Sequence, residues 1–147
     1  MSSPRPQLLV AEPPAGYRLR PPLVVDCSVM VAALFEEETC EEAVEMMSGK
    51  RLFAPDLLVH EMVNVAVRKL RSGWPSENVQ QAMMYFSVHD VELQPTDRVT
   101  QFELALRYNL SGYDAAYLWL AAELHAPLAT FDKKLAAAAQ IHLSGLR

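Results

Sequence analysis

The sequence predicts an α/β fold, a three-layer α/β/α domain with a central parallel sheet. Short apolar runs rich in β-branched and aromatic residues alternate along the chain with longer segments of helical periodicity. Strands that alternate with helices form parallel sheets covered by helices on both faces. The length of 147 residues and the 51% hydrophobic content fit one globular domain with a buried core.

The elements follow in order from apolar runs and turn signals. The expected strands are 23–26, 51–54, 91–93 and 128–130, with a possible last strand at 141–143. The expected helices are 28–35, 38–47, 55–71, 77–86, 97–108, 114–124 and 133–139. We expect Ser28 to cap the first helix and Gly73 to stop the third. Residues 1–22 hold six of the ten prolines, so we expect an N-terminal arm there and the domain at 23–147.

Composition excludes several classes of protein. The net charge of −5 argues against general coating of nucleic acid, although it leaves a nuclease with a local basic patch possible. The only cysteines, Cys27 and Cys40, form no disulfide framework. No apolar run approaches the ~20 residues of a membrane span, and none forms a signal-peptide core. We therefore expect a cytoplasmic protein that does not enter a membrane.

Four carboxylates stand in otherwise apolar contexts: Asp26, Glu61, Asp114 and Asp132. Buried unpaired carboxylates are costly, and no Arg or Lys lies within two residues of the first three. Asp26 and Asp132 end two expected strands, while Glu61 and Asp114 lie near the starts of two helices, so all four can converge at the carboxyl edge of the sheet. Any one of them could instead be a helix cap or a surface residue. Together they favour a divalent metal site.

Mg²⁺ and Mn²⁺ prefer oxygen ligands, and Mg²⁺ commonly combines one or two carboxylates with substrate phosphate. Four carboxylates could hold one ion, or two ions about 4 Å apart that assist an in-line phosphoryl displacement. The pattern therefore indicates metal-dependent phosphodiester chemistry, with Mg²⁺ or Mn²⁺ as cofactor.

Four segments carry a family resemblance. They are Val24-Val25-Asp26-Cys27-Ser28-Val29, Ala54-Pro55-Asp56-Leu57-Leu58 leading to Glu61-Met62-Val63-Asn64, Leu110-Ser111-Gly112-Tyr113-Asp114-Ala115-Ala116-Tyr117, and Ala126-Pro127-Leu128-Ala129-Thr130-Phe131-Asp132-Lys133-Lys134-Leu135. In this order and spacing the chain resembles the PIN-domain family, in particular the VapC-type toxins of toxin–antitoxin pairs.

The resemblance implies a PIN-like domain and an endoribonuclease whose catalytic and metal-binding residues are Asp26, Glu61, Asp114 and Asp132. It also implies an RNA substrate, an antitoxin partner and a homodimer. Family members usually begin close to the first Asp, so the arm is an extra feature. Many also carry a further acid near the third or fourth motif, where this chain has Ala115-Ala116 and Lys134. The number of bound metal ions, one or two, therefore stays open.

Neighbouring residues could support such a site. Ser28, Asn64 and Thr130 could hydrogen-bond the carboxylates, although as capping or packing residues they would look the same. RNA-backbone contacts could come from five basic residues, which a solvated helix end would explain equally well: Arg68, Lys69, Arg71, Lys133 and Lys134. The apolar stretch 83–86 and Trp74 are candidates for a twofold interface.

Two other functions compete with the nuclease. A non-catalytic PIN scaffold would act through protein or RNA binding, but an idle cluster of like charges would destabilise its fold. A phospho-accepting receiver domain also has an Asp at a strand end, yet it needs adjacent acids after the first strand, and Val24-Val25-Asp26-Cys27 offers one.

Overall fold

The computed structural model describes residues 19–146 of the chain. Four strands form one sheet in the order β3-β2-β1-β4, and every neighbouring pair is parallel. The strands are β1 (Pro22–Val25), β2 (Arg51–Pro55), β3 (Val91–Gln94) and β4 (Leu128–Ala129). Most of the expected N-terminal arm lies outside the described residues, and β1 begins at Pro22, one residue before the expected domain boundary.

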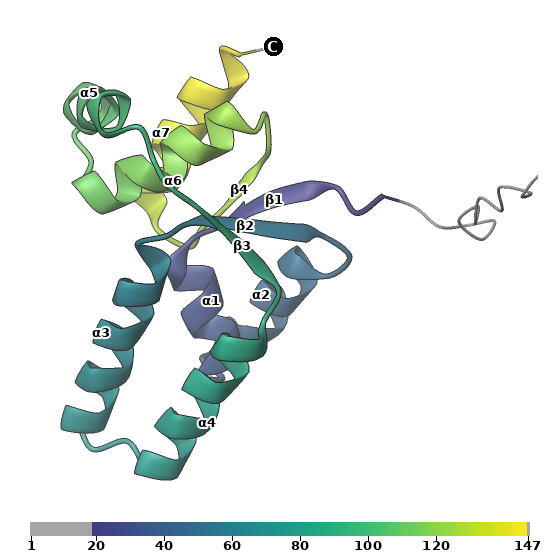
Figure 1. Ribbon diagram of the computed structural model, residues 1–147, viewed down its shortest axis with the longest axis vertical. Helices are drawn as coiled ribbons and strands as arrows, with labels where there is room; N and C mark the ends of the chain where they lie inside the picture. Colours follow the sequence, from purple (N-terminus) through teal and green to yellow (C-terminus); the bar gives the residue numbers. More distant parts are fainter. Residues whose placement is uncertain (1–18, 147) are drawn as a thin grey trace, which may run out of the picture.

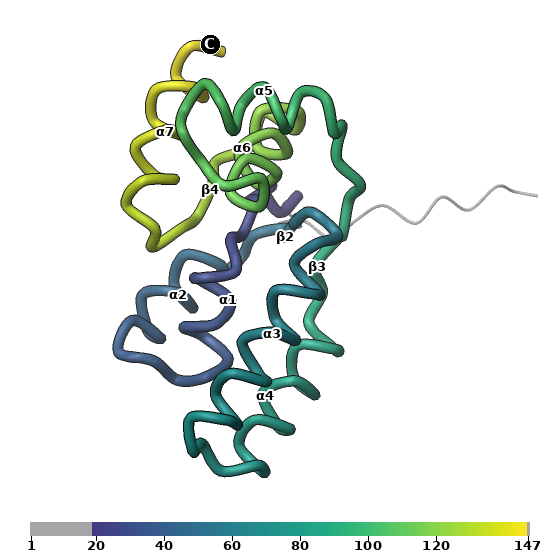
Figure 2. Tube along the Cα trace, turned by 90° about the vertical axis from the view of Figure 1, so that its left-hand side faces the viewer, coloured from purple at the N-terminus to yellow at the C-terminus, as the bar shows by residue number. Residues whose placement is uncertain are grey.

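Helices cover both faces of this sheet. In Figures 1 and 2, α1 to α4 lie on one side of the strands and α5 to α7 on the other, so the expected three-layer α/β/α arrangement is confirmed. The helices are α1 (Cys27–Leu34), α2 (Cys40–Met47), α3 (Leu58–Arg71), α4 (Ser76–Val88), α5 (Arg98–Tyr108), α6 (Gly112–Glu123) and α7 (Lys133–Ser144). Within residues 19–146, no helix combines the length and hydrophobicity that a membrane crossing requires.

The core lies where the apolar runs meet. Val24 and Val25 of β1 are fully buried, as expected for a central parallel strand. Helix α6 is apolar on nearly all sides because it packs against β1 and β2 with one face and against α5 and α7 with others. Its burial fixes the first turn of α6, which carries Asp114, beside the end of β1.

Two local predictions were wrong. Residues 141–143 continue α7 instead of forming a strand, because the alanine-rich sequence favours helix and nothing breaks it before Gly145. The contact between Tyr108 and His142 also packs this last part of α7 against α5. Ser28 does not cap α1, since the helix begins at Cys27 and Asp26 takes the cap position. The Ser28 hydroxyl is used in the site described below.

Candidate active site at the carboxyl edge of the sheet

Asp26 is the buried centre of the site. It follows β1 directly, and only 5% of its surface is exposed. Its Oδ2 accepts hydrogen bonds from the hydroxyls of Ser28, at 3.0 Å, and Thr130, at 2.5 Å. Burial raises the pKa of Asp26 above its ordinary value, and the bonds from Thr130 and Ser28 partly offset that rise. These hydroxyls therefore fix one carboxylate oxygen of Asp26 and leave Oδ1 on the other side of the group.

The same two hydroxyls join β1 to the loop after β4. Ser28 Oγ accepts a hydrogen bond from the backbone N–H of Phe131, and Thr130 Oγ1 accepts one from the backbone N–H of Asp132. Asp132 is the cap residue of α7, and its Oδ1 accepts from the N–H of Leu135 at 2.8 Å. The network thereby sets the position of Asp132 relative to Asp26, although the two lie 106 positions apart in the sequence.

Glu61 enters from the first turn of α3. Its Oε1 accepts a hydrogen bond of 2.6 Å from the hydroxyl of Tyr117, on α6. Burial raises the pKa of Glu61, the charges of Asp26 and Asp114 raise it further, and the bond from Tyr117 acts against them.

Asp114 lies in the first turn of α6. Ser111 caps this helix, because its Oγ accepts a hydrogen bond of 3.1 Å from the backbone N–H of Asp114. Burial raises the pKa of Asp114, as do the charges of Asp26 and Asp132, whereas Ser111 and Lys134 lower it. The charge of Asp26 raises the pKa of both Glu61 and Asp114, and the charge of Asp132 raises the pKa of Asp114, so these acids lie within electrostatic range of one another. The convergence of all four acids on one metal ion stays a prediction.

The cluster suits a divalent ion in its chemistry. Asp26, Glu61 and Asp132 each have one oxygen held by a protein donor, so the acids are oriented without being neutralised. Within residues 19–146, no group of three or more His, Cys, Asp or Glu side chains is arranged to hold a metal ion in this structure. An open, repelling set of carboxylates fits Mg²⁺, which retains several waters and takes few protein ligands.

No other nucleophile stands out beside these acids. Burial, together with the charges of Glu61 and Asp26, raises the pKa of the Cys27 thiol to about 12. At neutral pH this thiol therefore stays protonated and unreactive. Cys27 packs as a small buried side chain in the core next to Asp26.

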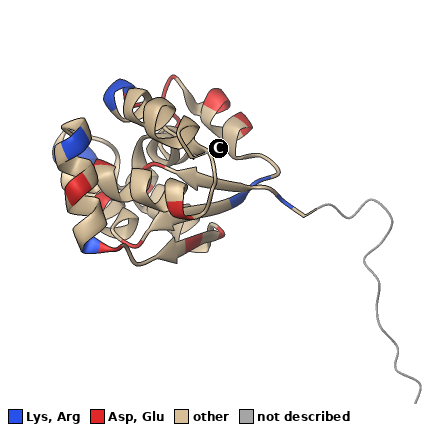
Figure 3. Ribbon diagram, turned by 90° about the horizontal axis from the view of Figure 1, so that it is seen from above, with Lys and Arg blue, Asp and Glu red and all other residues tan. Residues whose placement is uncertain are grey.

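The five basic candidates for RNA contact have different surroundings. Arg68 lies two turns after Glu61 on α3, is exposed, and its charge lowers the pKa of Cys27. Lys134 lowers the pKa of Asp114 and is exposed. Arg71 and Lys133 are also exposed. In the view of Figure 3, Lys and Arg segments alternate with Asp and Glu segments over the domain.

Lys69 is engaged elsewhere. Its Nζ lies 3.2 Å from Glu37 Oε1, 4.2 Å from the ring centroid of Trp74 and 5.1 Å from that of Phe35. Its side chain is only 17% exposed. Lys69 therefore joins the end of α3 to the loop after α1, a structural role that its sequence context did not reveal. Asn64 is exposed, and within the described residues its side chain makes no hydrogen bond to an acid.

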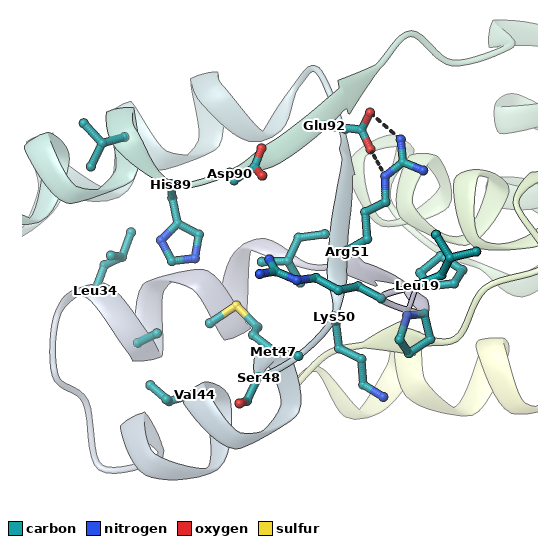
Figure 4. A pocket seen from close by; sticks show the side chains of 17 residues that line it. Leu19, Leu34, Val44, Met47, Ser48, Lys50, Arg51, His89, Asp90 and Glu92 are labelled. Atoms are coloured by element: carbon teal, nitrogen blue, oxygen red, sulfur yellow. Dashed lines mark hydrogen bonds and ion pairs between the residues drawn. The ribbon is translucent and has the colours of Figure 1, made fainter. Parts of the chain in front are cut away.

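A separate hollow of about 1280 Å³ lies at the opposite edge of the sheet (Figure 4). Pro22 and Arg51, the first residues of β1 and β2, line it, and the exposed ion pair between Arg51 and Glu92 closes at 2.7 Å beside it. In a parallel sheet the amino and carboxyl edges are opposite, so this hollow is remote from the four acids.

Comparison with known proteins identifies the class. Residues 23–141 match the PIN domain family. The chain belongs to the PIN-domain family and is of the VapC type. Ribonuclease VapC3 of Pyrobaculum aerophilum is 32% identical over 120 residues, which cover 78% of this chain and 92% of that protein. Ribonuclease VapC9 of Mycobacterium tuberculosis is 30% identical over 115 residues, which cover 77% and 87% of the two chains.

The fold has a solved counterpart. The crystal structure of PAE2754 from Pyrobaculum aerophilum superposes with a TM-score of 0.65, covering 87% of this chain and 98% of that one, at 20% sequence identity. At this identity the likeness concerns the fold alone. It agrees with the parallel sheet and the two helical layers described above.

Proposed function

We propose that this protein is a Mg²⁺- or Mn²⁺-dependent endoribonuclease and the toxin of a type II toxin–antitoxin pair. The observation that carries the proposal is the nearness of acids that follow β1 and β4 to acids in the first turns of α3 and α6: the charge of Asp26 raises the pKa of Glu61 and Asp114, and the charge of Asp132 raises that of Asp114. Membership of the PIN-domain family and the likeness to VapC ribonucleases support RNA as the substrate.

Each residue has a distinct role in this proposal. The four carboxylates hold the divalent ion, and Ser28 and Thr130 orient Asp26 through its Oδ2. A bound ion supplies Lewis-acid activation of the phosphodiester and of the attacking water. The exposed cations Arg68, Arg71, Lys133 and Lys134 attract the phosphates of the RNA backbone. The acids alone would repel RNA, so both the ion and these cations are needed for binding.

The non-catalytic scaffold is the alternative function. It leaves unexplained why the carboxylate of Asp26 is buried and held by two hydroxyls while its charge acts on Glu61 and Asp114, since such a cluster weakens the metal-free fold. Metal-dependent catalysis gives this energetic cost a function.

The family supports further proposals about partners. We propose an antitoxin protein that blocks the site, and a homodimer. On α4, Met84 is 66% and Tyr85 52% exposed, whereas Trp74 packs edge-on against Phe35 and contributes less free surface. The interface proposed here therefore centres on Met84 and Tyr85. A cytoplasmic location stays a prediction.

The test is RNA cleavage by purified protein freed of any antitoxin. Total RNA should be cut at internal sites in the presence of Mn²⁺ or Mg²⁺, and cutting should stop when EDTA is in excess and resume when Mn²⁺ is restored. Cleavage that persists in EDTA would contradict the metal-dependent mechanism. Binding of RNA without any cleavage under all metal conditions would favour the scaffold.

A further inference from the structure

Tyr117 is a core residue whose side chain has a single polar atom, the hydroxyl oxygen. The residue is fully buried on α6, the helix that packs against β1 and β2. Its hydroxyl reaches Glu61 Oε1 at 2.6 Å, although Glu61 belongs to α3 and lies 56 residues away in the sequence. A buried phenol needs a hydrogen-bond partner, and here that partner is one of the four acids.

The position of Tyr117 links two acids through one helix. It follows Asp114 by three residues on α6, so the two side chains lie on the same side of the helix. Asp114 faces the cluster from the first turn, and Tyr117 reaches Glu61 from the next. Any movement of α6 would therefore displace Asp114 directly and Glu61 through the hydroxyl of Tyr117.

The direction of the hydrogen bond is fixed by the two groups that form it. The phenol of Tyr117 has an O–H to donate and the carboxylate of Glu61 can only accept, so Tyr117 is the donor. Glu61 accepts through Oε1, and within residues 19–146 the structure gives its side chain no second hydrogen bond. Asp26 shows the same arrangement, in which protein hydroxyls hold only Oδ2.

We propose that Tyr117 is a positioning residue for Glu61: its hydroxyl holds Oε1 and turns Oε2 toward the cation that the other acids bind. The inference rests on the metal site proposed above. Glu61 is half-buried on a long side chain with several rotamers, and without the hydroxyl it would sample orientations that turn away from the other carboxylates. Ordering the side chain in advance lowers the cost of binding the ion.

The experiment is calorimetric titration of Mn²⁺ into RNA-free protein, with wild type and Tyr117→Phe compared. The substitution removes one hydroxyl and keeps the ring that fills the core. Losing such an orienting partner weakens metal binding by about 10- to 100-fold in other sites, so the Mn²⁺ Kd should rise by at least about tenfold. Thermal unfolding should show that Mn²⁺ raises the Tm of wild type by more than that of Tyr117→Phe.

Tyr108→Phe is the matched control. Tyr108 also donates or accepts through its hydroxyl, to Nδ1 of His142 at 3.0 Å, but between α5 and α7 and away from the acids. Its loss should leave the Mn²⁺ Kd unchanged. In steady-state cleavage, Tyr117→Phe should lower kcat at limiting Mn²⁺ and recover most of it at high Mn²⁺, with KM for RNA unaltered.

The outcomes separate this inference from the metal site itself. If wild type binds no Mn²⁺, the proposed metal site is wrong and the role of Tyr117 is overturned with it. If wild type binds Mn²⁺ and folded Tyr117→Phe binds it within about twofold as tightly, the metal site stands and only the positioning role is overturned.

Discussion

Replacing Asp26 by Asn should separate the chemistry of the site from its architecture. The amide has the shape of the carboxylate, and its carbonyl oxygen can accept hydrogen bonds from the hydroxyls of Ser28 and Thr130 as Oδ2 does. The amide NH₂ then stands where Oδ1 was, as a donor that cannot ligate a cation. The change removes one ligand and one negative charge while the buried hydrogen bonds remain.

The substitution should lower the rate of RNA cleavage without lowering the stability of the fold. Losing a ligand should cost about 4 kcal/mol of transition-state stabilisation, on the order of a thousandfold in rate. Stability should hold or increase. Because burial raises the folded-state pKa of Asp26, the folded protein binds this proton more tightly than the unfolded chain, and ionising Asp26 weakens the metal-free fold.

The pH dependence follows from that sign. Below the ordinary pKa of 3.8, Asp26 is protonated in both the folded and the unfolded protein, so wild type and Asp26→Asn should have similar stability. As the pH rises from 3.8 through the raised folded-state value, the metal-free wild type should lose stability relative to the variant. Saturating Mn²⁺ should reduce this difference, since the ion stabilises the ionised cluster of the wild type.

The assay is single-turnover RNA cleavage at saturating Mn²⁺, with urea unfolding of the same samples in EDTA across pH. Asp97→Asn is the control, because Asp97 is a carboxylate in the equivalent cap position of α5, where it is fully exposed and bonded to Thr100. Its cleavage rate should match wild type. A rate for folded Asp26→Asn within about tenfold of wild type would refute the ligand role.

Three further predictions address the cations and the apolar surface. Arg68→Ala should raise KM for RNA and leave kcat little changed. It should also reduce the slope of log binding constant against log salt concentration by about one unit. An unaltered slope would exclude a phosphate contact. Lys69→Ala should lower the free energy of unfolding by about 1 kcal/mol, because it removes a mostly buried cation from Glu37 and Trp74, and should leave the salt slope unchanged. Met84→Glu should shift sedimentation from dimer toward monomer, and a wild type that is monomeric at all concentrations would contradict the proposed interface.

The sequence predicted the candidate site residues that lie at, or just beyond, the end of a strand. Asp26 and Asp132 follow apolar runs, and Ser28 and Thr130 lie two residues from them, so local order along the chain was sufficient to anticipate the bonds Ser28–Asp26 and Thr130–Asp132. The bond from Thr130 to Asp26 joins residues 104 positions apart and depends on the pairing of β1 with β4. Residues 141–143 were misread because three β-rich residues carry little weight against a helix already formed.

Other features depend on segments that only the fold brings together. Tyr117 stands in an apolar run and would be taken for core packing, since its partner Glu61 comes from a different helix. Lys69 shares a basic helix end with Arg68, yet Phe35, Glu37 and Trp74 surround it from two other segments. Basic residues adjacent in sequence thus differ in their surroundings, with Lys69 packed against other segments and Arg68 exposed, and no local pattern could have separated them.

The central claim is that the four carboxylates at the carboxyl edge form a divalent-metal site. Anomalous diffraction at the manganese edge, from crystals grown with Mn²⁺, tests it most directly. A peak bounded by the carboxylates of Asp26, Glu61, Asp114 and Asp132, and absent from crystals of Asp26→Asn, is the predicted result. A peak elsewhere on the domain, or none beside Asp26 at saturating Mn²⁺, would contradict the account.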